Sequence, residues 1–129
     1  MADILLAEDD QSMRQYLKKA LEKAGHVVWA VGDGLDAMEA IEHDRFDLLL
    51  ADIVMPGMDG IELARRARDR CPEMPVMFIT GFAAVALKAQ NEFDPETKVL
   101  SKPFHLRDLV DEVEKVLRRS SEQMVGPRS

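Results

Sequence analysis

The sequence contains a single cysteine, Cys71, and no long apolar run. One cysteine can form neither an internal disulfide nor a thiolate metal cluster, so both are excluded. No apolar stretch approaches the roughly 20 residues that a membrane-spanning helix needs, so we expect no contact with a membrane. The first residues also lack the basic and apolar segments of a secretory signal. We therefore expect a cytoplasmic protein.

Positive charge is also scarce, since 17 lysines and arginines face 24 acidic residues and give a net charge of −7. This balance disfavours nucleic-acid binding through a generally basic face. Four arginines do cluster between positions 65 and 70, but they alternate with alanines in a manner typical of a solvated helix face. The histidines lack the i, i+4 spacing of a metal site, so none is predicted to be a ligand: His26, His43 and His105.

The chain has enough apolar residues for a hydrophobic core, with 47% hydrophobic content over 129 residues. This length fits one domain and leaves little room for a second. We predict one folded domain over residues 1–119. Residues 120–129 are mostly polar and end in Gly126-Pro127-Arg128-Ser129, so we predict a disordered tail there.

Short apolar runs alternate with helical periods along the whole chain. The runs predict five strands, at Ile4–Ala7, His26–Ala30, Phe46–Ala51, Val76–Ile79 and Lys98–Ser101. Apolar residues at helical spacing predict five helices, at 13–24, 35–41, 59–67, 82–90 and 106–117. At the third of these, Asp59 followed by Glu62 has the pattern of a capping box. The alternation predicts an α/β fold, a doubly wound parallel sheet with helices on both faces.

Residues suited to phosphate chemistry follow four of these strands. Glu8-Asp9-Asp10 follows the first strand and Asp52 the third, while Thr80 and Lys102-Pro103 follow the fourth and fifth. Periodicity does not give the strand order. In the order 2-1-3-4-5, however, the first and third strands are neighbours at the switch point, where ligands bind. The carboxylates would then lie close together.

Close carboxylates repel one another, and a magnesium ion relieves the repulsion because it prefers oxygen ligands. An ionised Asp52 could attack a phosphorus atom and become an acyl phosphate. The Lys102 ammonium and the Thr80 hydroxyl would bind oxygens of the transferring phosphoryl group, and Gly81 would leave open space beside them. The sequence therefore predicts a magnesium-dependent phosphoryl site on Asp52.

Two other classes of protein use similar parts. A haloacid-dehalogenase-like phosphatase also uses Asp, magnesium, Thr and Lys, but it needs a second Asp two residues after the nucleophile, and that position is Val54. A flavodoxin-like cofactor binder needs hydroxyls or glycines after the first strand, where three carboxylates would repel a phosphate. Both alternatives are disfavoured.

Four motifs together resemble the receiver domain of response regulators, over residues 3–118. They are Leu5-Leu6-Ala7-Glu8-Asp9-Asp10, Asp52-Ile53-Val54-Met55-Pro56-Gly57-Met58-Asp59-Gly60, Thr80-Gly81 and Lys102-Pro103. The resemblance implies a five-stranded sheet of order 2-1-3-4-5 in a CheY-like fold, and a protein that is not an enzyme beyond assisting its own phosphorylation. It also implies a cis peptide bond between Lys102 and Pro103.

The resemblance further implies a role for each site residue. Asp52 would be the phospho-acceptor, Thr80 the hydroxyl that moves toward the phosphoryl group, and Lys102 its ion-pair partner. Magnesium would bind Asp9, Asp52 and the Val54 carbonyl directly and Glu8 through water, while Asp10 lies outside the pair. The phosphodonor partner would be a histidine kinase or a histidine phosphotransferase.

One position departs from the family pattern. Three residues before the lysine, receivers often carry an aromatic residue whose rotamer reports phosphorylation, and here the residue is Val99. The usual coupling between the threonine and an aromatic ring is therefore in doubt. Movement of the backbone and of the helix after Thr80 would have to transmit the signal instead.

The segment from Phe82 to Leu87 is apolar on all sides of the predicted helix, so part of it should be exposed and available to a partner. The alternative is that small alanines simply cover a tight surface. We predict a partner surface that includes Phe82, Val85, Ala86 and Val99.

The same segment resembles that of the single-domain CpdR-type receivers of alphaproteobacteria. That resemblance implies a link between a cell-cycle phosphorelay and the ClpXP protease, with control of protease localisation and substrate delivery that phosphorylation switches off. It also implies that the protein itself can lie at a cell pole. A chemotaxis-like receiver or a phosphorelay shuttle with another partner is the alternative within the family.

Overall fold

The computed structural model describes residues 2–94 and 97–125, and for residues 121–125 it describes the backbone alone. Five parallel strands form one sheet in the order β2-β1-β3-β4-β5, which confirms the predicted order. The strands are β1 (Asp3–Ala7), β2 (Val27–Val31), β3 (Leu48–Asp52), β4 (Val76–Thr80) and β5 (Lys98–Ser101). The first and third strands are therefore neighbours, with Ala7 opposite Ala51 at their carboxyl ends.

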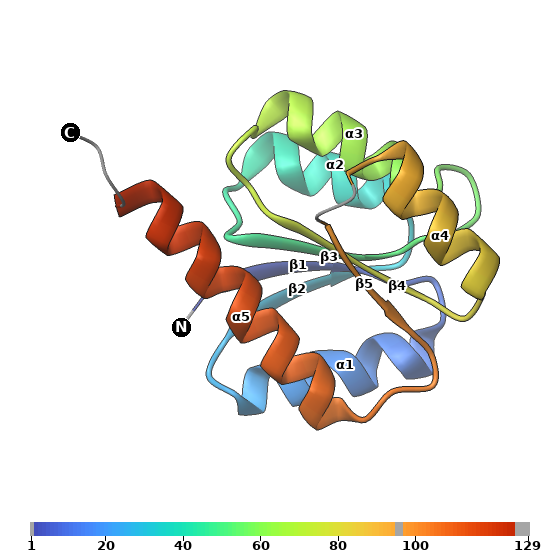
Figure 1. The fold of residues 1–129 in the computed structure, drawn as a ribbon, viewed down its shortest axis with the longest axis horizontal. Coiled ribbons are helices and arrows are strands. Elements are labelled where there is room, and N and C mark those ends of the chain that lie inside the picture. Colours follow the sequence, from blue (N-terminus) through green and yellow to red (C-terminus); the bar gives the residue numbers. More distant parts are fainter. Residues whose placement is uncertain (1, 95–96, 126–129) are drawn as a thin grey trace.

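Helices cover both faces of the sheet, as the alternating pattern predicts. They are α1 (Gln11–Lys23), α2 (Gly34–His43), α3 (Gly60–Arg70), α4 (Ala83–Glu92) and α5 (Leu106–Val125). In Figure 1, α2 and α3 lie above the sheet and α1 and α5 below it. The side chains of α4 join the core on the α2–α3 face, whereas those of α5 pack with α1. None of the described helices is long and apolar enough to cross a membrane.

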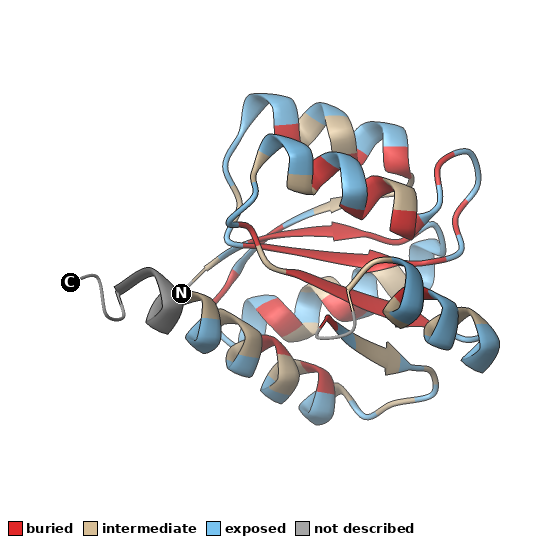
Figure 2. Cartoon of the chain, turned by 45° about the horizontal axis from the view of Figure 1, so that its top comes forward, coloured by how far each residue is buried: buried red, intermediate tan, exposed pale blue. Residues whose placement is uncertain are grey.

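The central strands β1, β3 and β4 are buried on both faces and are red in Figure 2, apart from the exposed first residue of β1. Leu5, Leu49 and Phe78 face one core, and Ile4, Leu50 and Met77 face the other. This double burial explains why the sequence shows continuous apolar runs here rather than alternation. The polar residues at the strand ends therefore extend from a rigid, fully packed sheet.

Aspartates begin three of the helices. The side chains of Asp10, Asp33 and Asp59 each accept a hydrogen bond from the backbone N–H three residues later, at 3.0, 2.8 and 2.8 Å. The bond from the Glu62 N–H to Asp59 confirms the helix start predicted from the capping pattern. All three caps end loops that follow a strand, so they fix the loops along the edge of the sheet where the carboxylates gather.

Glycine is required where α3 approaches the end of β3. A Cβ atom on Gly60 would collide with the Asp52 carbonyl oxygen and lie 2.8 Å from the Ile53 Cα. The Gly60 N–H also donates a 2.7 Å hydrogen bond to the Ile53 carbonyl. The loop from residue 53 to residue 59 thus returns closely to Asp52, which fixes the backbone beside that carboxylate.

Several predicted boundaries were wrong by one or two residues. Strand β3 begins at Leu48 rather than Phe46 and includes Asp52, and β4 includes Thr80, so these two residues are the last of their strands. Strand β2 is shifted one residue onward, to Val27–Val31. Phe82 is the N-cap of α4 rather than its first helical residue. The apolar pattern ends before the polar residues Asp52 and Thr80, whereas the backbone pairing of the sheet continues through them.

The final helix is longer than predicted. Helix α5 continues to Val125, beyond the end of the apolar pattern at Leu117 and into the segment predicted as a tail. Residues 126–129 lie outside the described residues. The division into a domain over residues 1–119 and a tail over residues 120–129 stays a prediction.

Candidate functional site

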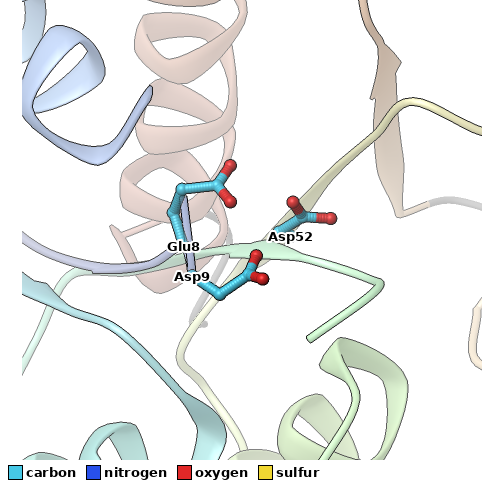
Figure 3. Close-up of side chains that lie close together, drawn as sticks. All are labelled: Glu8, Asp9 and Asp52. Atoms are coloured by element: carbon cyan, nitrogen blue, oxygen red, sulfur yellow. The ribbon is translucent and has the colours of Figure 1, made fainter. Parts of the chain in front are cut away.

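Three carboxylates converge at the carboxyl ends of β1 and β3. One ligand atom from each of Glu8, Asp9 and Asp52 lies within 4.8 Å of the others. Figure 3 shows the three side chains directed into the same space, two of them from the turn after β1 and the third from β3. Oxygen donors at this spacing suit magnesium, which binds few protein carboxylates and keeps several waters. The residues therefore fit the ion that the sequence predicts.

The three carboxylates differ in exposure. Glu8 is fully buried and Asp52 is 5% exposed, whereas Asp9 is exposed. The cluster thus opens to solvent on the Asp9 side, and an ion or a small phosphodonor could enter there. Burial of like charges is costly unless a cation or a proton offsets them.

Lys102 supplies the cation. Its Nζ atom lies 3.1 Å from Glu8 Oε1 and 3.1 Å from Asp52 Oδ2, and its side chain is 24% exposed. Burial opposes the lysine charge, but the hydrogen bond and the charge of Asp52, followed by those of Glu8, outweigh it and raise the lysine pKa. The ammonium therefore stays charged and holds two carboxylates from different strands together.

A proton on Glu8 also reduces the repulsion between the buried carboxylates. Burial, followed by a hydrogen bond to Asp52 and the charge of Asp52, raises the Glu8 pKa from 4.5 to about 7. The Asp10 N–H, at 3.2 Å from Glu8 Oε2, and Lys102 act in the opposite direction. Near neutral pH, the Glu8 carboxylate without a metal ion therefore carries a proton for part of the time.

Thr80 and the loop after β3 complete the wall of the site. The Thr80 hydroxyl accepts a 3.1 Å hydrogen bond from the Phe82 N–H. The backbone carbonyl of Thr80 accepts a 2.7 Å hydrogen bond from the Lys102 N–H. The Val54 N–H donates to Asp52 Oδ1 at 3.1 Å. A Cβ atom on Gly81 would meet only Lys102 Cδ at 4.0 Å, so the predicted open space beside Thr80 is confirmed. The Lys102–Pro103 peptide bond is cis, as predicted.

The structure thus brings Glu8, Asp9, Asp52 and Lys102 together, with Thr80 bonded to the Lys102 backbone. Asp10 has a different role, because its carboxylate accepts the Met13 N–H at the start of α1. Sequence reasoning missed Arg14, whose Nη1 donates a 2.8 Å hydrogen bond to the Glu8 carbonyl. Arg14 belongs to none of the sequence motifs, and its position is that of an ordinary charged residue in an amphipathic helix.

The predicted partner surface divides into two kinds of residue. Phe82 is 58% exposed, whereas Val85 and Val99 are half-buried and pack against the core, and Ala86 is half-buried. Leu87, which belongs to the same apolar segment but was not singled out, is 61% exposed. The large exposed apolar residues of this segment are therefore Phe82, at the N-cap of α4, and Leu87, within α4. The expectation that part of this segment is exposed is confirmed.

Comparison with known proteins agrees with these features. Residues 4–114 match the family model described as response regulator receiver domain. The response regulator receiver protein CpdR of Brucella abortus is 60% identical over 117 residues, which cover 91% of this chain and 98% of that protein. The transcriptional regulatory protein TctD of Salmonella typhimurium is 38% identical, and the match covers 94% of this chain but only 54% of TctD.

Solved structures show the same fold. A response regulator receiver protein from Sinorhizobium medicae superposes with a TM-score of 0.85 at 32% identity, covering 92% of this chain and 95% of that one. NtrX from Brucella abortus gives a TM-score of 0.87 at 28% identity, covering 95% of this chain and 28% of NtrX. The CpdR and Sinorhizobium medicae proteins are both described as response regulator receiver proteins, and this chain has Val54 where a haloacid-dehalogenase-like phosphatase needs an acid. The chain therefore belongs to the response regulator receiver domain family and is most similar, among these relatives, to CpdR.

Proposed function

We propose that the chain accepts a phosphoryl group on Asp52 and thereby switches a protein-binding surface. The observation that carries this proposal is the triad of Glu8, Asp9 and Asp52, bridged by Lys102 at 3.1 Å from both Glu8 and Asp52. A buried carboxylate held beside an ammonium and an acidic ion site is what transfer to an aspartate requires.

In the proposed reaction, an Asp52 carboxylate oxygen attacks the phosphorus atom of the donor. The bond from phosphorus to the donor's leaving group breaks, and its electron pair leaves with that group. Asp9, Asp52 and the Val54 carbonyl would hold magnesium directly and Glu8 through water, and the bound ion would neutralise phosphoryl oxygen charge. Lys102 would move from Glu8 to a phosphoryl oxygen, and the Thr80 hydroxyl would turn from the Phe82 N–H to another.

A receiver domain implies a kinase as a partner, and we propose a histidine kinase or a histidine phosphotransferase as the donor. The 60% identity to CpdR supports a CpdR-type output, namely control of ClpXP protease localisation or substrate delivery in the cytoplasm. We propose that the form without phosphate is the active one. A chemotaxis-like or shuttle receiver remains the alternative, and binding to the ClpX component distinguishes the two.

The first prediction concerns the phospho-acceptor. Incubation with acetyl phosphate and magnesium should add one labile phosphoryl group, detected as a mass increase of the intact native protein. Asp52→Ala should gain none, and Asp9→Asn should lose most of the labelling because a metal ligand is removed. Asp10→Asn is the matched control, since asparagine caps α1 equally well and should label normally. Equal labelling of native protein and Asp52→Ala would exclude Asp52 as the acceptor.

The second prediction concerns pH. Because the Glu8 pKa lies at about 7, magnesium must displace a proton, and its affinity should rise as the pH increases through neutrality and then level off. The raised pKa also stabilises the metal-free fold below about pH 4.5, and this contribution is lost as the pH rises through about 7. Calorimetric titration with magnesium from about pH 5 to about pH 9 measures the first effect. Glu8→Gln should flatten the profile, and an unchanged profile would contradict the assignment to Glu8.

The third prediction concerns the output surface. Leu87→Glu and Phe82→Glu should weaken binding to ClpX by about tenfold or more, since exposed apolar anchors contribute most to such interfaces. Phosphorylation of Leu87→Glu should be normal. Leu35→Glu on α2 is the matched control, because Leu35 is 66% exposed on another helix. If Leu87→Glu and Phe82→Glu bind ClpX in a pull-down as well as the unaltered protein and Leu35→Glu do, α4 is not the contact surface.

A further inference from the structure

Arg14 contacts the turn that carries two of the three acidic side chains. Its Nη1 atom donates a 2.8 Å hydrogen bond to the backbone carbonyl oxygen of Glu8. A guanidinium bonded to a carbonyl makes a charge-assisted hydrogen bond, which is stronger than a neutral one. That carbonyl belongs to the peptide unit between Glu8 and Asp9, so the bond fixes the plane from which the Asp9 side chain leaves the chain.

The Arg14 side chain also lies close to the turn after β2. The backbone N–H of Arg14 donates a 2.8 Å hydrogen bond to the Asp10 carbonyl in the first turn of α1. A Cβ atom on Gly32 would lie 3.0 Å from Arg14 Nη1, so the side chain lies directly against the turn after β2. Glu8 is also joined to β2, because its N–H donates to the Val31 carbonyl at 3.1 Å. Arg14 therefore bonds to the turn after β1 and lies against the turn after β2.

Arg14 and Lys102 act on Glu8 in different ways. Lys102 binds the carboxylates of Glu8 and Asp52, and a cation or phosphoryl group entering the site competes for these contacts. Arg14 binds the backbone, so its contact can persist whatever binds the carboxylates. An arginine is also permanently charged, so this contact does not depend on pH.

We propose that Arg14 is a positioning residue, which holds the Glu8–Asp9 peptide in the orientation that magnesium binding requires. This inference rests on the proposed function of the acidic cluster. A positioning role predicts the opposite change in magnesium affinity from an effect of charge alone. By Coulomb repulsion alone, removal of a cation near the cluster would tighten magnesium binding. Loss of a positioning contact would weaken it, because the carboxylates would no longer be preorganised.

The test compares magnesium affinity among four proteins by calorimetry at constant ionic strength. Arg14→Ala should bind magnesium about tenfold more weakly than the unaltered protein, as loss of outer-shell contacts does at other metal sites. Arg14→Lys keeps the charge and one donor, and its affinity should fall between the two. Arg70→Ala is the matched control, since Arg70 is an exposed arginine on α3 and its loss changes the net charge equally. The magnesium affinity of Arg70→Ala should stay within about twofold of that of the unaltered protein.

A second measurement needs no metal. Amide hydrogen exchange of the Glu8 and Asp10 N–H groups, which bond to Val31 and to the Glu8 side chain, should be faster in Arg14→Ala. Exchange of the Met77 amide in the buried strand β4 should be unchanged and reports that the fold is intact.

Equal or tighter magnesium binding by Arg14→Ala, with Met77 still protected, would overturn the inference. If that variant does not fold, Arg14→Lys serves in its place, and binding equal to that of the unaltered protein would overturn the inference. If the unaltered protein binds no magnesium, the proposed function fails. The metal-free exchange comparison then still decides whether Arg14 holds the turn, and unchanged Glu8 and Asp10 exchange would show that it does not.

Discussion

The structure depends on how two neighbouring carboxylates are kept close together inside a folded protein. Glu8 and Asp52 are both buried, and their mutual repulsion would favour separation of β1 from β3. The Lys102 ammonium at 3.1 Å from each carboxylate offsets this repulsion, and a proton on Glu8, whose pKa is raised to about 7, offsets more of it. In the proposed reaction a metal ion would take the place of the proton, and Lys102 would exchange Glu8 for a phosphoryl oxygen as its partner. The contacts that hold the two carboxylates together are therefore also the ones that the proposed reaction would change.

The fold determines which residues can take part in this exchange. Parallel strands β1, β3 and β4 are adjacent, so residues that end them meet at one edge of the sheet. The Lys102 N–H bonds to the Thr80 carbonyl, which attaches the lysine to the end of β4. The Thr80 hydroxyl in turn accepts the N–H of Phe82, the N-cap of α4. In the proposed switch, a change of partner at Lys102 or Thr80 would reach the start of α4 through two hydrogen bonds, one between backbone groups and one from the Phe82 N–H to the Thr80 hydroxyl.

This path bears on Val99, which replaces the aromatic residue that many receivers carry. Val99 is half-buried and packs against the core, so it has no ring to move between an inner and an outer position. Helix α4 has no side-chain cap hydrogen bond and only one fully buried residue, Ala89. It is therefore weakly anchored compared with α3, in which five residues are buried. We therefore propose that movement of α4 transmits a change at Thr80.

Much of the fold and of the site could be predicted from the sequence, because both follow from pattern. Continuous apolar runs such as Leu48–Ala51 indicate doubly buried strands, and polar residues that end such runs must meet at one edge. The strand order came from resemblance, since periodicity carries no information on which strands are adjacent. Arg14 was missed because its role lies in a bond to a backbone carbonyl, which no residue spacing encodes. Leu87 was missed because exposure within an apolar helix depends on tertiary packing. The extension of α5 to Val125 was missed because its last turns are polar.

The central claim is that Asp52 receives the phosphoryl group and that Lys102 then leaves Glu8 for it. The most direct measurement is a crystal structure with magnesium and beryllofluoride, a stable mimic of a phosphoryl group on a carboxylate. The account predicts the mimic on Asp52, with Lys102 Nζ and the Thr80 hydroxyl in contact with its fluorine atoms and no longer bonded to Glu8 and Phe82. A mimic bound to Asp9 or Glu8, or a Lys102 that still bridges Glu8 and Asp52 beside a modified Asp52, would contradict it.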